Sequence, residues 1–185
     1  MSCPITRPRR LRRSQALRDM VAEFSLSRDD LRYPIFVVHG SGITKEISSM
    51  PNQYHWSSDK LDELVVSAGI KSLMIFGVPK TKDLWSTENY DADGITQQAI
   101  RKIKELDPEL VVATDVCMCS FTPHGHCGIL DENDNVDNDN TLEIIQKTVV
   151  SHAQAGADIV APSGYDGRVW VYEYRNKKEA IREAM

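Results

Sequence analysis

The sequence predicts an α/β protein built on a parallel β-sheet, because short apolar runs alternate with amphipathic stretches of helical period. Four nearly continuous runs rich in Val, Ile or Phe are typical of strands that are buried on both faces. They span residues 33–38, 72–78, 109–116 and 157–163. Successive runs begin about 40 residues apart, which leaves room for a helix between each pair and fits βα units.

Three helices are expected between these strands. The first follows Asp59, and the second ends before Asp107. The third is expected to begin at Asn140, where Glu143 completes a capping-box pattern, and to end at Gly156. The apolar faces are expected to consist of Leu61, Leu64, Val65 and Ala68; of Ile95, Ala99, Ile100 and Ile103; and of Leu142, Ile145, Val149 and Ala153.

Two architectures fit this order of elements. One is an open, doubly wound sheet, and the other is part of a (β/α)₈ barrel. A dinucleotide-binding sheet would carry a glycine-rich loop after its first strand, and neither "VVHGSG" nor "IFGVPK" has that spacing. A whole barrel takes about 250 residues, so four strands would form half of one.

Composition fits one soluble globular domain. The 185 residues are 41% hydrophobic and 26% charged, close to ordinary usage. No apolar run approaches the roughly 20 residues of a membrane helix, and the amino terminus lacks the apolar core of a secretory signal. We therefore expect a cytoplasmic protein without a membrane partner.

Basic residues gather at the amino terminus, although the formal net charge is −5. Six arginines precede the first acidic residue, Asp19; they are Arg7, Arg9, Arg10, Arg12, Arg13 and Arg18. We interpret residues 1–30 as a basic arm with a first helix that docks on an acidic surface of its own or another subunit. A mitochondrial transit segment is an alternative. A nucleic-acid partner is not expected, because no aromatic interleaving or binding motif accompanies the arginines.

The segment "DVCMCSFTPHGHCGIL" places three cysteines just after the third predicted strand. Cys117 and Cys119 are two residues apart, so their side chains would point the same way in an extended segment, and Cys127 returns after a turn. Three thiolates around Zn²⁺ would leave one position for water or substrate, as in a catalytic zinc site. His124 and His126 could ligate or support the ligands. The alternatives are unligated thiols or a redox disulfide between Cys119 and Cys127.

Two further polar residues lie at the carboxyl ends of predicted strands. Asp115 precedes Cys117 by two residues, and Ser163 ends the fourth strand. In a barrel, that end carries the chemistry. Asp115 could hold a substrate ammonium group or tune a metal, or it could simply cap a turn.

Two other segments attract notice. "LDENDNVDNDN", residues 130–140, lacks the glycine and glutamate of a calcium loop, so we interpret it as a solvated turn that caps the next helix. "WVYEYRNKK", residues 170–178, has alternating aromatics and could be a strand, an interface strip or an insertion.

Several motifs together resemble the amino-terminal half of the porphobilinogen synthase (5-aminolevulinate dehydratase) family. They are "RPRRLRR", "DDLRYPIFVVHG", "IFGVP", "DADGITQQAIRKIKE", "TDVCMCSFTPHGHCGIL" and "AGADIVAPSG", in the family's order and over nearly the whole chain. The cysteine segment is specific to the zinc-dependent branch.

The resemblance implies a (β/α)₈ TIM barrel, of which residues 31–185 would form roughly the first four βα units. It implies that Cys117, Cys119 and Cys127 bind Zn²⁺, that Asp115 lies by the substrate with the free amino group, and that Ser163 lines the pocket. The implied reaction condenses two 5-aminolevulinate molecules to porphobilinogen with loss of water, in haem and tetrapyrrole biosynthesis. The implied assembly is a homo-oligomer, often an octamer, with the arm wrapping a neighbour.

The family binds its substrates covalently through lysines that lie in the second half of the barrel. None of the ten lysines of this sequence has a matching context. We therefore expect the 185-residue chain alone to be inactive unless a complementary chain supplies them. The alternative is a non-catalytic zinc-binding or assembly protein derived from the metal half of the barrel.

Overall fold

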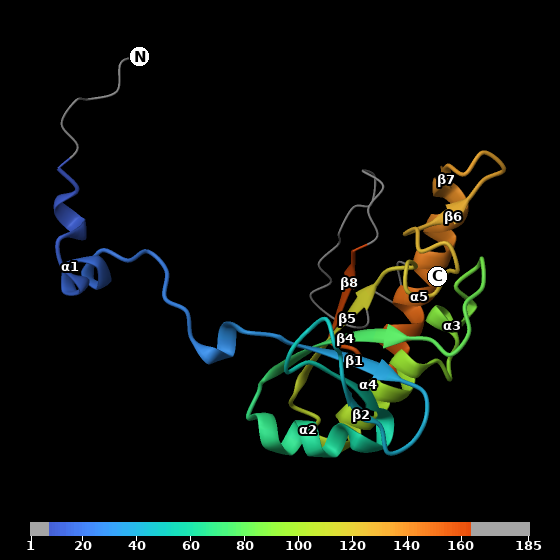
Figure 1. The fold of residues 1–185 in the computed structure, drawn as a ribbon, viewed down its shortest axis with the longest axis horizontal. Helices are drawn as coiled ribbons and strands as arrows, with labels where there is room; N and C mark the ends of the chain where they lie inside the picture. Colours follow the sequence, from blue (N-terminus) through green and yellow to red (C-terminus); the bar gives the residue numbers. More distant parts are fainter. Residues whose placement is uncertain (1–7, 164–185) are drawn as a thin grey trace, which may run out of the picture. The chain divides into compact units, whose positions relative to one another are not determined.

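The computed structural model describes residues 8–163, which form two compact units divided at Asp30. The predicted aromatic segment at residues 170–178 lies outside the described residues. The main unit contains a six-stranded sheet whose order along the sheet is β2-β3-β1-β4-β5-β8 (Figure 1). Its strands are β1 (Tyr33–Val38), β2 (Thr44–Glu46), β3 (Tyr54–Ser57), β4 (Ser72–Val78), β5 (Val111–Val116) and β8 (Ile159–Pro162).

The four predicted strands are present, parallel and adjacent in chain order. β1 pairs with β4, β4 with β5, and β5 with β8. Among these four strands the order does not reverse, as it would at the switch point of a doubly wound sheet. Each step from one of these strands to the next therefore moves in the same direction, which is how a barrel is wound.

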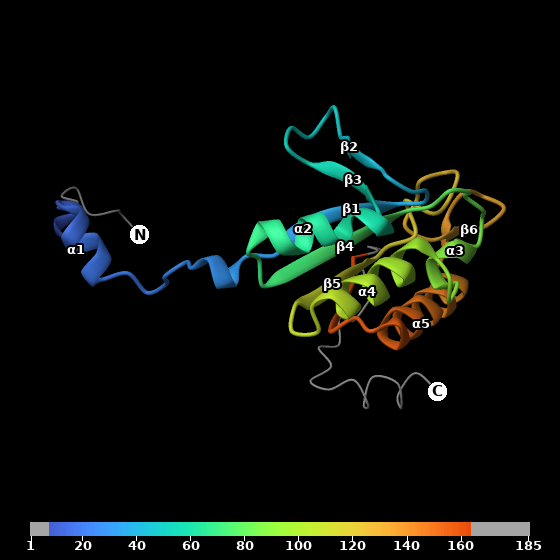
Figure 2. The same cartoon turned by 90° about the horizontal axis from the view of Figure 1, so that it is seen from below.

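The three predicted helices lie together on one face of this sheet (Figure 2). They are α2 (Leu61–Ala68), α4 (Ile95–Leu106) and α5 (Asn138–Ala155). A doubly wound sheet would have helices on both faces, whereas a barrel carries all of them outside. The one-sided helix layer and the strand order thus both favour the barrel over the open sheet.

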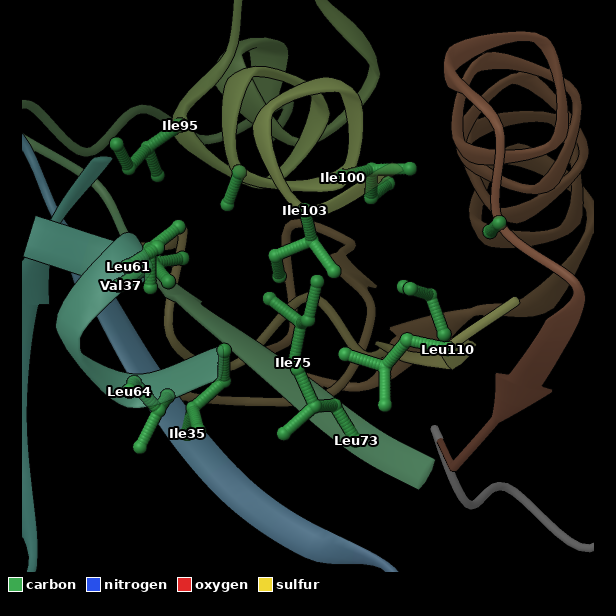
Figure 3. Packing of buried hydrophobic residues seen from close by; sticks show 13 residues of the cluster. Ile35, Val37, Leu61, Leu64, Leu73, Ile75, Ile95, Ile100, Ile103 and Leu110 are labelled. Atoms are coloured by element: carbon green, nitrogen blue, oxygen red, sulfur yellow. The ribbon is translucent and has the colours of Figure 1, made fainter. Parts of the chain in front are cut away.

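The core fills the space between the helices and the sheet. Alternate residues of β1 and β4 are buried toward the helices, including Ile35 and Ile75. Figure 3 shows Ile103 of α4 pointing toward Ile75 of β4. The predicted face of α4 is confirmed, because Ile95, Ala99, Ile100 and Ile103 are at most 1% exposed.

The prediction for the third helix was wrong at two points. α5 begins at Asn138, and its N-cap is Asp137, whose side chain accepts a hydrogen bond from Asn140 N. Leu142 was placed on the buried face but is 37% exposed. Ile145 and Ala153 are buried as predicted, and the buried side of the helix also includes three polar residues that form hydrogen bonds; these are Thr141, Thr148 and His152. Gly156 does cap the helix, with φ of 120°.

Three small elements were not predicted. β2 and β3 form an antiparallel hairpin, and β3 extends the sheet beside β1. β6 (Ile129–Leu130) and β7 (Val136–Asp137) form a second hairpin over the acidic segment. Asp131 Oδ1 closes its turn by accepting hydrogen bonds from Asn133 N and Asn135 N. The short helix α3 (Thr87–Tyr90) precedes α4.

Residues 8–30 make up the described part of the amino-terminal unit and contain no buried side chain. The helix α1 (Gln15–Met20) is capped by Ser14, whose hydroxyl accepts from Leu17 N. Gln15 bonds to Arg18 and Asp19 one turn later. Local capping and side-chain pairs, rather than a core, hold this helix together.

Candidate metal centre and substrate site

The predicted site residues gather at the carboxyl edge of β5 and β8. Asp115 is the fifth residue of β5, and Cys117 follows the strand directly. Asp115 pairs in register with Ala161 of β8, and Ser163 N extends the ladder by donating to Val116 O at 3.3 Å. Residues 115, 117 and 163 therefore share one edge because the two parallel strands end together.

The three cysteines converge on one point. Cys117 Sγ lies 3.2 Å from Cys119 Sγ and 3.3 Å from Cys127 Sγ, and all three sulfurs lie within 4.8 Å of one another. Cys117 is buried, while Cys119 and Cys127 are partly exposed. No other group of three or more potential metal-binding side chains occurs among residues 8–163.

A turn, rather than the extended segment expected from the sequence, brings Cys119 toward Cys117. Phe121 N and Thr122 N both donate to Met118 O, at 2.9 and 3.0 Å, so the chain reverses just after Cys117. Asp83 N donates to Phe121 O and ties this turn to the loop after β4. The position of Cys119 is thus fixed by main-chain hydrogen bonds.

Gly77 allows this turn to lie close against β4. A Cβ atom at residue 77 would come within 2.2 Å of Thr96 Oγ1 and 2.9 Å of Phe121 Cζ. Real Cβ atoms do not approach other atoms so closely. A glycine is therefore needed where the strand meets both α4 and the cysteine loop.

The thiol cluster suits a soft metal ion. Burial raises the pKa of the Cys117 thiol, and its thiol neighbours raise it further. Without a cation the buried sulfur would keep its proton, whereas a bound divalent ion favours the thiolate and releases that proton. Three sulfur donors are a donor set that favours zinc over magnesium or calcium.

Asp115 is hydrogen-bonded to Ser163, whose hydroxyl donates to Asp115 Oδ1. Burial raises the pKa of the Asp115 carboxyl, and the hydrogen bond from Ser163 lowers it in part. Ser163 is exposed and Asp115 is partly buried. A carboxylate in this position can bind a cationic group that approaches the carboxyl edge.

The two histidines of the cluster lie outside the sulfur triad. His124 Nδ1 accepts from His126 N at 3.1 Å, and the two rings are 5.5 Å apart. His124 is partly exposed and His126 is exposed. Neither belongs to the group of converging metal-binding atoms.

Sequence reasoning missed a buried polar cluster behind the cysteines. Asn89 Nδ2 donates to Cys117 O at 3.1 Å, and Gln97 Nε2 donates to Asn89 O at 2.9 Å. Gln97 Nε2 also reaches Ser151 Oγ on α5. One sequence offers no local signal for such contacts, because Asn89 and Cys117 are 28 residues apart.

None of the lysines within residues 8–163 is buried. Lys104, on α4, bonds to Leu110 O and to Asp158 at the amino ends of the strands. Lys80 follows β4 at the carboxyl edge, but its side chain is exposed. The described part of the chain thus contains no amine in a dry pocket.

The architecture defines a barrel-type α/β protein, and its thiol cluster is a candidate metal-binding site at the carboxyl edge of the sheet. The sequence profile of the delta-aminolevulinic acid dehydratase family matches residues 5–184. The chain therefore belongs to the delta-aminolevulinic acid dehydratase family.

Individual relatives agree with this assignment. The chain is 51% identical over 170 residues to the delta-aminolevulinic acid dehydratase of Ruminiclostridium josui, covering 90% of this chain and 82% of the relative. It is 47% identical to that of Methanothermus sociabilis, covering 100% of this chain and 56% of the relative. Several others, including that of Bacillus subtilis (57%), are also covered over about half their length.

A solved structure agrees as well. The delta-aminolevulinic acid dehydratase (porphobilinogen synthase) of Toxoplasma gondii ME49, in complex with the reaction product porphobilinogen, matches with a TM-score of 0.78 and 34% identity. The match covers 97% of this chain and 50% of that one. The prediction of the barrel family, with about half of a barrel in this chain, is confirmed.

Proposed function

We propose that this chain carries the metal half of a porphobilinogen synthase site. The reaction would condense two 5-aminolevulinate molecules to porphobilinogen with loss of water, in tetrapyrrole and haem biosynthesis. One observation carries the proposal. Three cysteine sulfurs within 4.8 Å of one another lie at the same strand edge as the Asp115–Ser163 pair.

The metal is proposed to be Zn²⁺, held by Cys117, Cys119 and Cys127. Three sulfur donors leave one of the four usual zinc positions open. A zinc ion there would act as a Lewis acid toward a substrate oxygen. His126 immediately precedes Cys127 in the sequence. It would stabilise the metal ligands without binding the metal itself.

Asp115 and Ser163 are proposed to bind substrate. The carboxylate of Asp115 can accept hydrogen bonds from a substrate ammonium group, and Ser163 orients that carboxylate through Oδ1. Charge-assisted hydrogen bonds of this kind are about twice as strong as neutral ones. The pair would therefore hold one substrate's amino group beside the metal.

The covalent step needs an amine that burial has made nucleophilic. No lysine of the described residues meets that requirement. We propose that these lysines come from outside the 185 residues, in the same or a complementary chain, and that the 185-residue chain alone is inactive. Because none of the described lysines is buried, a second candidate function is that of a zinc-binding assembly protein that catalyses no reaction.

The assembly is proposed to be a cytoplasmic homo-oligomer, as the family resemblance implies, with residues 1–30 as a separate arm and residues 31–185 as the barrel part. Among the described residues, no helix is long and apolar enough to cross a membrane.

The test is substrate trapping. The 185-residue chain, with Zn²⁺ and 5-aminolevulinate, should form no porphobilinogen and no borohydride-stable adduct. Adding a polypeptide that carries the remaining strands should restore both, and Cys119→Ala should abolish the restored turnover. Complementation that restores neither would favour the assembly protein. An adduct on a lysine of the isolated chain would overturn the assignment of the covalent step.

A further inference from the structure

The side chain of Asn89 contacts the main chain of a proposed metal ligand. Asn89 lies in α3 and is 1% exposed. Its Nδ2 donates to Cys117 O at 3.1 Å, in a hydrogen bond that is itself buried. The carboxamide orientation follows from chemistry, because a carbonyl oxygen can only accept and the nitrogen must face it.

The hydrogen bond acts where the regular sheet ends. β5 stops at Val116, and the chain turns after Met118, so Cys117 lies between the last ladder residue and the cysteine turn. Its carbonyl orientation sets the direction in which the chain enters that turn. Fixing this peptide therefore fixes where Cys117 Sγ lies relative to Cys119 Sγ.

Asn89 is itself held from behind. Gln97 of α4 is fully buried, and its Nε2 donates both to Asn89 O and to Ser151 Oγ of α5, at 2.9 Å each. Asn89 N donates to Ser86 O at 2.9 Å. The short helix that carries Asn89 is thus tied to two long helices, and Asn89 cannot shift without breaking buried hydrogen bonds.

We propose that Asn89 is a positioning residue for the metal centre, which presets the Cys117 peptide through its carboxamide. This inference rests on the proposed function, because it assumes that Cys117 is a ligand. Groups that hydrogen-bond to a metal's ligands orient them, and their loss typically weakens metal affinity about 10- to 100-fold. Asn89 does so through the main chain of Cys117. Loss of its carboxamide should therefore lower zinc affinity more clearly than it lowers the free energy of unfolding.

The experiment compares substitutions of buried residues, each made in the full chain in its native assembly. Asn89→Leu keeps the approximate size but removes the donor, and Asn89→Ala removes it without adding bulk. Thr96→Val is the matched control, because the buried Thr96 hydroxyl has no hydrogen-bond partner among the described residues. Zn²⁺ dissociation constants are measured by competition with a chromophoric chelator, and thiolate-to-metal charge-transfer bands are recorded with Co²⁺.

Both Asn89 variants should bind Zn²⁺ about 10- to 100-fold more weakly, while Thr96→Val stays within about twofold of the parent. At saturating Co²⁺ the variants should still show the charge-transfer bands, because all three thiols remain. Asn89 variants that bind within about twofold of the parent, or a Thr96→Val chain that weakens equally, would overturn the proposal. A parent chain that binds no zinc would overturn the proposed metal site as well. Failure of the metal site can therefore be distinguished from failure of the positioning role of Asn89.

Discussion

The Ser163 hydroxyl donates a hydrogen bond to Asp115 Oδ1 although the two residues are 48 positions apart in the chain. The contact exists because β5 and β8 are neighbours in register, with Asp115 opposite Ala161. Since residues 161 and 163 point the same way in extended chain, Ser163 reaches the carboxylate from one step further along. The hydrogen bond thus holds the Asp115 carboxylate at the carboxyl end of β5, two residues before Cys117.

Ser163→Ala should lower turnover without lowering zinc content. Removing a hydrogen bond to a charged group costs about 1.5–3 kcal/mol, so kcat/KM in the complete assembly should fall about 10- to 100-fold. Ser72→Ala is the control, since that buried hydroxyl lies at the amino end of β4 and has no partner among the described residues. Loss of zinc together with activity would show that Ser163 supports the metal loop rather than the substrate.

His152 should make stability depend on pH. Burial lowers its pKa from 6.5 to about 4, and its Nδ1 lies 3.0 Å from Thr114 Oγ1. The unfolded chain therefore binds a proton first as pH falls, and the free energy of unfolding should decrease from about pH 6.5 down to about pH 4. The decrease should approach about 1.4 kcal/mol per pH unit, or about 3 kcal/mol in all.

The measurement for His152 is urea unfolding at pH 7 and pH 5 in the parent chain and in His152→Gln. The variant keeps a group that can hydrogen-bond to Thr114 but does not titrate. The difference in unfolding free energy between parent and variant should change with pH in the stated direction. Parallel pH profiles would contradict the assignment of a neutral, buried histidine.

Gly77→Ala should destabilise the fold and disturb the cysteine loop. The new methyl would lie 2.2 Å from Thr96 Oγ1 and 2.9 Å from Phe121 Cζ, and overpacking of this kind costs about 1–3 kcal/mol. Combining it with Thr96→Ala should recover part of the loss, which thermal unfolding would measure. Strictly additive effects would show that the predicted clash is relieved elsewhere.

The 185-residue chain should self-associate. Phe36 and Phe76 stack at 5.3 Å on the sheet face opposite the helices, and both remain only partly buried. Apolar side chains that are left partly uncovered on a sheet face favour pairing with another chain. Sedimentation should show a dimer or a larger species, and a compact, stable monomer would count against a half-barrel.

Much of the fold was predictable because its strands are buried on both faces. Continuous apolar runs identified β1 and β4 at their observed bounds, and β5 and β8 to within two residues. The buried face of the third helix was predicted only in part, because it includes Thr141, Thr148 and His152, which form hydrogen bonds that apolar periodicity does not indicate. The two small hairpins were not predicted, because β2, β6 and β7 are only two or three residues long.

Only part of the candidate site was predictable from the sequence. Close spacing drew attention to Cys117, Cys119 and Cys127, and the structure brings their sulfurs together. Asn89 and Gln97 were not predictable, because each acts through a contact with a segment distant in sequence. Their neighbours along the chain give no sign of those contacts.

The most direct measurement is X-ray absorption at the zinc edge on the reduced, purified chain, together with metal content. About one Zn²⁺ per chain should be bound through sulfur at roughly 2.3 Å. Cys119→Ala should remove most of the metal, while replacement of Cys3, which lies far from the segment 115–130 in the sequence, should remove none. A spectrum with only oxygen and nitrogen neighbours would contradict the three-cysteine metal centre on which the proposed function depends.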